Sequence, residues 1–292
     1  MITVSGLTKR YGDRAVVDGV TFSLEPGSVT GFLGPNGAGK TTTMRMITGL
    51  VPASAGEALV DGRRYADLPN PAALMGTLLD AGAVHPGRTG RAHLRILADT
   101  VGVPATRVDE VLELVDLGSA GKRRIGAYSL GMRQRLGIAG ALLADPPVLM
   151  FDEPANGLDP EGIRWMRELL RGHAGRGGTV LLSSHLLGEV EHTVDRLVVI
   201  GSGRIVADGP ISELLAGDGV LVRALDPAAL AEDLRRAGHV VAVADPDGGT
   251  LRVAGVVPEQ VGAIAAAGGH VLVDLRPADR ELEELFFQLT AA

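Results

Sequence analysis

A glycine-rich run between residues 34 and 41 has the residue types of a loop that binds phosphate. The run Gly34-Pro-Asn-Gly-Ala-Gly-Lys40-Thr41 follows an apolar stretch predicted to be a strand, Val29–Leu33, and opens a predicted short helix that stops at Gly49. Glycines let successive backbone N–H groups point at phosphate oxygens, and the helix N-terminus adds the positive end of its dipole. Lys40 can place a charge at β- and γ-phosphates, and Thr41 can offer its hydroxyl to Mg²⁺.

Lysine is scarce in this chain, which makes Lys40 informative. Of 28 basic side chains other than histidine, only Lys9, Lys40 and Lys122 are lysine. A compact ammonium suits a phosphate cradle that a planar guanidinium would not fit. A simple turn in a chain with 41 glycines is the alternative, but it does not explain a lysine at the required position. The residues expected around the nucleotide phosphates are Gly34, Pro35, Asn36, Gly37, Ala38, Gly39, Lys40, Thr41 and Thr42.

Two acidic residues follow a second apolar strand. The predicted strand at Pro147–Phe151 ends directly at Asp152 and Glu153. A carboxylate at a strand end beside a phosphate loop can hold Mg²⁺, which is the role expected of Asp152. The next carboxylate, on Glu153, can act as general base on an attacking water. Solvated acids at a strand end are the alternative interpretation.

A Ser-Leu-Gly sequence at residues 129–131 separates this chain from most other proteins with phosphate loops. With it, residues 1–215 resemble the ATP-binding subunits of ABC transporters. That resemblance implies that the Ser129 hydroxyl and the Gly131 N–H contact phosphate, although the signature departs from the usual Leu-Ser-Gly-Gly-Gln at Met132 and Arg133. Ser129 also fits the N-cap of a predicted helix.

The same resemblance assigns roles to residues that would say little alone. It implies that Tyr11 stacks on adenine, that Asp159 belongs to the D-loop, and that His185 contacts the γ-phosphate. The catalytic set is then Glu153, His185 and Lys40, with ATP and Mg²⁺ as the ligands. Each residue has a structural alternative, since Tyr11 could be a surface aromatic, His185 a satisfied histidine at a strand end, and Asp159 the N-cap of the next helix.

Asp80 is a departure from the family. It follows the apolar stretch Leu74–Leu79, where the family normally has a glutamine. A carboxylate can bind Mg²⁺ directly or through water, so Asp80 joins Thr41 and Asp152 as an expected metal ligand. It also adds negative charge near the γ-phosphate and cannot donate a hydrogen bond as an amide does. An ordinary strand-end aspartate is the alternative.

Strands alternating with helices predict a parallel sheet with helical crossovers. The resemblance implies an α/β P-loop NTPase domain of the ABC type at residues 1–215, with an antiparallel β subdomain and a helical subdomain near 82–144. In the latter, apolar spacing predicts a helix over Arg107–Leu117 with Thr106 as N-cap. The pattern of residues 216–292 predicts a small α+β unit with a split-βαβ order. We expect this unit to be an appendage that stabilises or regulates a dimer; the alternative is a cap that only adds stability.

Composition excludes several classes. The chain is 46% hydrophobic and 22% charged, which is a globular balance, and it has no cysteine for disulfides or thiolate chemistry. No stretch reaches the roughly 20 apolar residues of a membrane span, and the N-terminus does not resemble a signal peptide. The net charge of −7 argues against nucleic acid as a partner.

The function implied is an ATP-hydrolysing subunit of an ABC transporter that exports a drug, antibiotic or peptide. The expected partners are a separate integral membrane permease and a second copy of the chain. The resemblance implies that the two copies sandwich ATP between them. The expected location is peripheral, on the cytoplasmic side of the cell membrane. The alternative is a soluble ABC-type ATPase outside transport, acting on nucleic acid, ribosomes or cluster assembly. A GTPase or kinase would not explain Ser129–Arg135.

Overall fold

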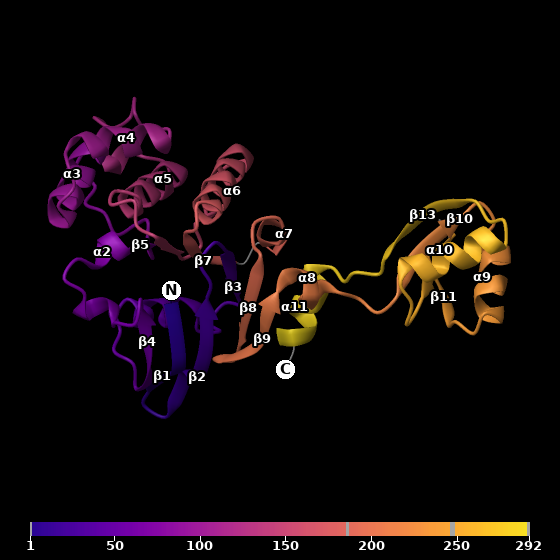
Figure 1. The fold of residues 1–292 in the computed structure, drawn as a ribbon. Helices are drawn as coiled ribbons and strands as arrows, with labels where there is room; N and C mark the ends of the chain where they lie inside the picture. Colours follow the sequence, from indigo (N-terminus) through magenta and orange to yellow (C-terminus); the bar gives the residue numbers. More distant parts are fainter. Residues whose placement is uncertain (1, 185–186, 246–248, 291–292) are drawn as a thin grey trace. The chain divides into compact units, whose positions relative to one another are not determined.

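The computed structural model describes residues 2–184, 187–245 and 249–290. The chain forms two compact units, residues 1–211 with 286–292, and residues 212–285 (Figure 1). None of the helices in these described ranges is long and apolar enough to cross a bilayer.

A six-stranded sheet forms the centre of the first unit within the described residues. Its order is β5-β6-β7-β3-β8-β9; the first five strands are parallel and β8–β9 is an antiparallel hairpin. Every residue of β3, β6 and β7 is buried, as the near-continuous apolar runs of a parallel sheet require. The strands are β5 (Met75–Leu78), β6 (Val148–Phe151), β7 (Thr179–Ser184), β3 (Val29–Leu33), β8 (Arg196–Gly201) and β9 (Arg204–Pro210).

A three-stranded antiparallel sheet lies against this core, with order β2-β1-β4 (Figure 1). Its inward residues join one hydrophobic cluster with the central sheet and the first helix, and the Phe22 and Phe32 rings lie 5.5 Å apart within it. The first helix contributes Met44 and Ile47 to that cluster. The elements are β1 (Ile2–Tyr11), β2 (Arg14–Leu24), β4 (Ala55–Val60) and α1 (Lys40–Ile47), followed by a short 3-10 turn η1 (Tyr65–Asp67) and α2 (Pro71–Leu74).

Three helices gather in the segment predicted to be helical (Figure 1). They are α3 (Gly90–Val101), α4 (Thr106–Leu114) and α5 (Leu130–Ala141), with a 3-10 turn η2 (Ile125–Ala127) before α5. The prediction that Thr106 caps α4 is wrong, because Ala105 is the N-cap and is already helical. The Pro104 carbonyl accepts a bond from the Arg107 N–H, so the turn begins before Thr106.

Two further helices flank the last parallel strands. They are α6 (Pro160–Gly175) before β7 and α7 (Leu187–Glu191) after it. Asp159 caps α6 as predicted, accepting a hydrogen bond from the Gly162 N–H at 2.8 Å. Pro160 occupies the first helical turn, where its missing N–H costs nothing.

The elements between residues 220 and 290 have the predicted βαββαβα order. Four strands of the second unit form an antiparallel sheet in the order β11-β12-β10-β13. The two central strands are therefore β12 and β10. Apolar residues of α9 and α10 pack with one face of the sheet. The elements from residue 211 onward are α8 (Ile211–Leu215), β10 (Val220–Ala224), α9 (Pro227–Arg236), β11 (Val241–Asp245), β12 (Thr250–Val253), α10 (Pro258–Ala267), β13 (Leu272–Pro277) and α11 (Leu282–Thr290). The second half of α11, from Phe286, belongs to the first unit.

The negative charge of the chain is concentrated in this second unit. Residues 212–285 hold 13 acidic and 6 basic side chains, which accounts for the whole net charge of −7. The first unit, where an anionic nucleotide is expected to bind, is therefore formally neutral.

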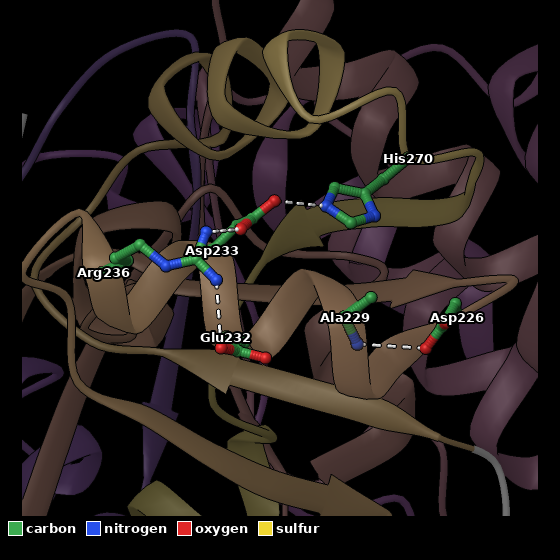
Figure 2. A network of polar contacts seen from close by, with 6 residues as sticks. All are labelled: Asp226, Ala229, Glu232, Asp233, Arg236 and His270. Atoms are coloured by element: carbon green, nitrogen blue, oxygen red, sulfur yellow. Dashed lines mark hydrogen bonds and ion pairs between the residues drawn. The ribbon is translucent and has the colours of Figure 1, made fainter.

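A polar network in the second unit joins α9 to the segment before β13 (Figure 2). The Asp233 carboxylate lies 2.8 Å from His270 Nε2, and its other oxygen accepts a bond from Arg236. Arg236 also contacts Glu232 at 3.0 Å, and Asp226 caps α9. The hydrogen bond with His270, followed by the charge of Arg236, holds the pKa of Asp233 below its ordinary value.

Asp233→Asn should lower the thermal stability of the second unit at pH 7. Because the folded pKa of Asp233 is depressed, its contribution is fully present above the unfolded pKa of about 4. That contribution is lost as the pH falls through the lower folded pKa. Calorimetric unfolding of the full chain between pH 3 and pH 7 measures the difference. Glu232→Gln, on the same helix but in an exposed pair, serves as control and should have little effect. If Asp233→Asn lost as much thermal stability at pH 3 as at pH 7, the expectation would be contradicted.

Candidate active site

The glycine-rich loop runs from the end of β3 into α1, as the sequence predicts. Gly34 is required by space, because a Cβ there would lie 2.4 Å from the Ile200 carbonyl oxygen. Gly39 is required by conformation as well, since its φ is 109° and a Cβ would lie 2.8 Å from the Val16 carbonyl oxygen. Gly39 is also the N-cap of α1 and offers no capping side chain, which leaves the N–H groups of the first turn available to an anion.

Two hollows lie against this loop. One, of about 250 Å³, is lined by Lys40, Glu153 and most of the predicted phosphate-binding residues. The other, of about 330 Å³, has Arg14 and the turn at Ser202 and Gly203 in its wall. The loop and first-turn residues that line one or both hollows are Pro35, Asn36, Gly37, Ala38, Gly39, Lys40, Thr41 and Thr42.

Lys40 is 7% exposed and is turned back onto its own loop. Its Nζ donates to the Gly34 carbonyl at 2.6 Å and lies 3.4 Å from the Pro35 carbonyl. The same Nζ lies 4.0 Å from a carboxylate oxygen of Glu153. The ammonium charge is therefore already at the loop and beside the predicted general base.

Asp152 is bonded to two hydroxyl groups from different elements. Thr41 Oγ1, on α1, donates to one carboxylate oxygen at 2.6 Å, and Ser183 Oγ, on β7, donates to the other. A hydroxyl and a carboxylate in contact are suitable ligands for a hard cation. In the described residues no group of three or more His, Asp or Glu side chains could hold a metal by itself. A Mg²⁺ held by Thr41 and Asp152 would therefore take its remaining ligands from water and phosphate, as this ion commonly does.

Glu153 has an unusual backbone conformation. Its φ is 51°, in the left-handed region that residues other than glycine seldom adopt. Its N–H donates to Ser183 Oγ at 2.9 Å, and its carbonyl accepts a bond from Gln134 Nε2 at 3.1 Å. Sequence reasoning did not single out Ser183 or Gln134. Ser183 could have been noticed in the sequence, because it is a polar residue near the end of a strand that is otherwise largely apolar.

The signature residues lie at the start of α5 and contact the loop before α6. Ser129 Oγ caps α5 by accepting from the Met132 N–H at 3.2 Å. Gly131 approaches Gly157 so closely that a Cβ would lie 2.6 Å from the Gly157 carbonyl oxygen. Further along, the Arg135 guanidinium lies 4.5 Å from the Trp165 ring centroid of α6. The start of α5, with Ser129 and Gly131, therefore packs against the loop that ends at Asp159.

Two other predicted residues, Tyr11 and Asp80, have no hydrogen bond to the phosphate loop within the described residues. Tyr11 is 55% exposed at the β1–β2 hairpin, with Lys9 Nζ 5.0 Å from its ring centroid. Asp80 is exposed, and its carboxylate accepts a bond from the Gly82 N–H at 2.7 Å. No hydrogen bond links Asp80 to Thr41 or Asp152 in the described part of the chain. His185 lies outside the described residues.

Two family models match different parts of this chain. The ABC transporter family model matches residues 17–156, and a model for a domain of unknown function, DUF8746, matches residues 218–283. The bacitracin transport ATP-binding protein BcrA of Bacillus licheniformis is 40% identical over 219 residues, covering 73% of this chain and 71% of that protein. The Nod factor export ATP-binding protein I of Burkholderia orbicola is 36% identical over 299 residues, covering 99% and 96%.

Solved structures have the same fold in the first unit. The structure of an ATP-binding subunit of an ABC transporter superposes with a TM-score of 0.68 at 29% identity, covering 73% of this chain and 91% of that one. A dimeric ATP-binding cassette with ADP and Pi bound has a TM-score of 0.64 at 21% identity, covering 72% and 99%. The chain belongs to the ABC transporter family, as one of its ATP-binding subunits. It is an ATPase of that type, and the predicted family and fold class are confirmed.

Gly34→Ala should destabilise the first unit and weaken ATP binding. The added Cβ meets a backbone oxygen that no side-chain rotation can remove, so a cost of about 1–3 kcal/mol is expected. Chemical unfolding measures the stability, and titration with a fluorescent ATP analogue measures binding. The control is Gly175→Ala, at a helical position with open space around it, which should be neutral or stabilising. Equal behaviour of the two variants would show that the close approach is unimportant.

Proposed function

We propose that this chain powers the export of a drug, antibiotic or peptide through a separate membrane permease. The observation that carries the proposal is the convergence of Lys40, Thr41, Asp152 and Glu153 on the glycine-rich loop. The cargo class is supported by a relative named for bacitracin transport, and the direction of transport by one named for Nod factor export. Those transport names favour an exporter over an ABC-type ATPase that acts outside transport.

The chemistry proposed for the site is hydrolysis of the γ-phosphate of ATP. Lys40 exchanges the Gly34 carbonyl for β- and γ-phosphate oxygens, and the loop N–H groups bind the remaining charge. Thr41 and Asp152 would hold Mg²⁺, which would neutralise charge on the β- and γ-phosphates. Glu153 takes a proton from the attacking water, and the positive charge of Lys40 stabilises the charge that develops in the transition state.

We propose that two copies of the chain sandwich each ATP. The chain has one phosphate loop and one signature, and in the structure Ser129 and Gly131 belong to a different group of contacts from Lys40. In the proposed dimer, Ser129 and Gly131 of one copy face the phosphate bound by its partner. The dimeric cassette of the same fold is consistent with that arrangement. Asp159 is assigned to the dimer contact.

The remaining assignments are also proposals. Tyr11 would stack on adenine and His185 would contact the γ-phosphate. Asp80 would approach the metal only after exchanging its bond to Gly82. We propose that 1–215 is the ATP-binding domain, with its helical subdomain near 82–144. Residues 216–292 would form an appendage that stabilises or regulates the dimer, and the permease would hold the chain at the cytoplasmic side of the membrane.

Glu153→Gln is the direct test of the mechanism. The amide keeps the size of the side chain but cannot accept a proton from water, so turnover should fall by about 100-fold or more. ATP binding and ATP-dependent dimerisation should persist, because the loop and Asp152 are intact. Phosphate release measures turnover, and light scattering measures the dimer. Glu168→Gln, an exposed position on α6, is the matched control. Wild-type turnover in Glu153→Gln would exclude the general-base role.

We propose that the permease docks on the stretch from Asp80 to Arg95, which includes the start of α3. Arg91 forms an ion pair with Asp109, and both line a hollow of about 410 Å³ between α3 and α4. Replacing Arg88 and Arg91 together by Gln should reduce co-purification with the permease and reduce transport, because cationic donors are removed from this surface. ATP hydrolysis by the isolated chain should be unchanged. Arg164→Gln, exposed on α6, is the control. Intact permease binding and transport in the double variant would place the contact elsewhere.

A further inference from the structure

The backbone of Glu153 is held by side chains from two separate elements. Its φ of 51° is one that residues other than glycine seldom adopt, and such conformations persist only where their surroundings enforce them. Ser183 Oγ accepts the Glu153 N–H at 2.9 Å, and Gln134 Nε2 donates to the Glu153 carbonyl at 3.1 Å. Both main-chain polar groups of this residue are therefore bonded to side chains.

The two side chains that hold Glu153 are themselves fixed. Ser183 is 0% exposed and Gln134 is 4% exposed. Ser183 also donates to Asp152, so its hydroxyl acts both as donor and as acceptor. Gln134 lies on α5, which contacts the loop after Glu153 where Gly131 meets Gly157. The Glu153 carbonyl also accepts the Asn156 N–H at 3.2 Å, so Gln134 adds a second donor, from another element, to a carbonyl that already belongs to a turn. Removing this donor leaves a buried amide contact unmade and frees the peptide after Glu153 from its link to α5.

We infer that Gln134, together with Ser183, is a positioning residue that sets the direction in which Glu153 presents its carboxylate. This inference rests on the proposed role of Glu153 as general base. A general base must lie within hydrogen-bond reach of the proton it takes, and the peptide geometry at Glu153 determines where its side chain starts. Gln134 lies on α5, the helix that Ser129 caps and that contains Gly131. A shift of α5 would therefore be passed through Gln134 to the backbone of Glu153.

The test replaces Gln134 by Met, which keeps the length and burial of the side chain but removes its N–H donors. The expected result is a fall in kcat of about 10- to 100-fold, because a small misplacement of a catalytic group is sufficient for such a loss. KM for ATP should stay within about two-fold, since the phosphate loop is untouched. Leu136→Met, at a fully buried position of the same helix, is the matched control for altered packing.

A double variant separates positioning from general structural damage. If Gln134 acts through Glu153, Gln134→Met should lower turnover little further once Glu153 is already Gln, whereas independent effects would add. Should Gln134→Met fail to fold, Gln134→Leu removes the same donors in an apolar side chain and should also lower kcat. An unchanged kcat, or an additive double variant, would overturn the inference. Absence of turnover in the wild-type chain, or its survival in Glu153→Gln, would instead contradict the proposed function.

Discussion

The Asp152 carboxylate, by accepting hydrogen bonds from Thr41 and Ser183, joins three segments that lie far apart in sequence. Thr41 begins the helix after β3, Asp152 follows β6, and Ser183 lies near the end of β7. These groups can meet only if the three strands run parallel and adjacent, which is the observed order β6-β7-β3. Asp152 and Glu153 thus follow the carboxyl end of a buried apolar strand, the edge at which parallel sheets commonly bind ligands.

The outer elements hold the phosphate loop in place from the opposite side. β2 brings the Val16 carbonyl against Gly39, and the β8–β9 turn approaches the same strand. The Asp18 N–H donates to the Gly203 carbonyl at 2.8 Å, and Arg204 bonds the Asp18 carboxylate at 2.6 Å. The loop is therefore enclosed by backbone on several sides, which explains why glycine is needed there for space as well as for conformation.

Local signals in the sequence predicted much of this site, and non-local ones were missed. The phosphate loop, the Asp152-Glu153 pair and the cap at Asp159 each depend on a short run of residues whose physics is self-contained. The strand and helix order of the second unit followed from turn residues and periodicity. By contrast, Gln134 and Ser183 act on a backbone group 19 and 30 residues away, and no periodic pattern encodes that partnership. Pairing of the antiparallel strands was also not readable, because β1 has several irregularities in its register.

The folded-back position of Lys40 has a consequence for which anions the loop accepts. In the structure its ammonium already has a short bond to the Gly34 carbonyl and a carboxylate nearby, so an incoming anion competes with partners rather than meeting an open cation. A single phosphate offers few contacts to offset the loss of those bonds. A triphosphate with its metal would also engage the loop N–H groups, Thr41 and Asp152, which would offset the loss of the two bonds. With the site proposed above, the intramolecular bond would therefore discriminate against small anions, at the expense of some affinity for ATP itself.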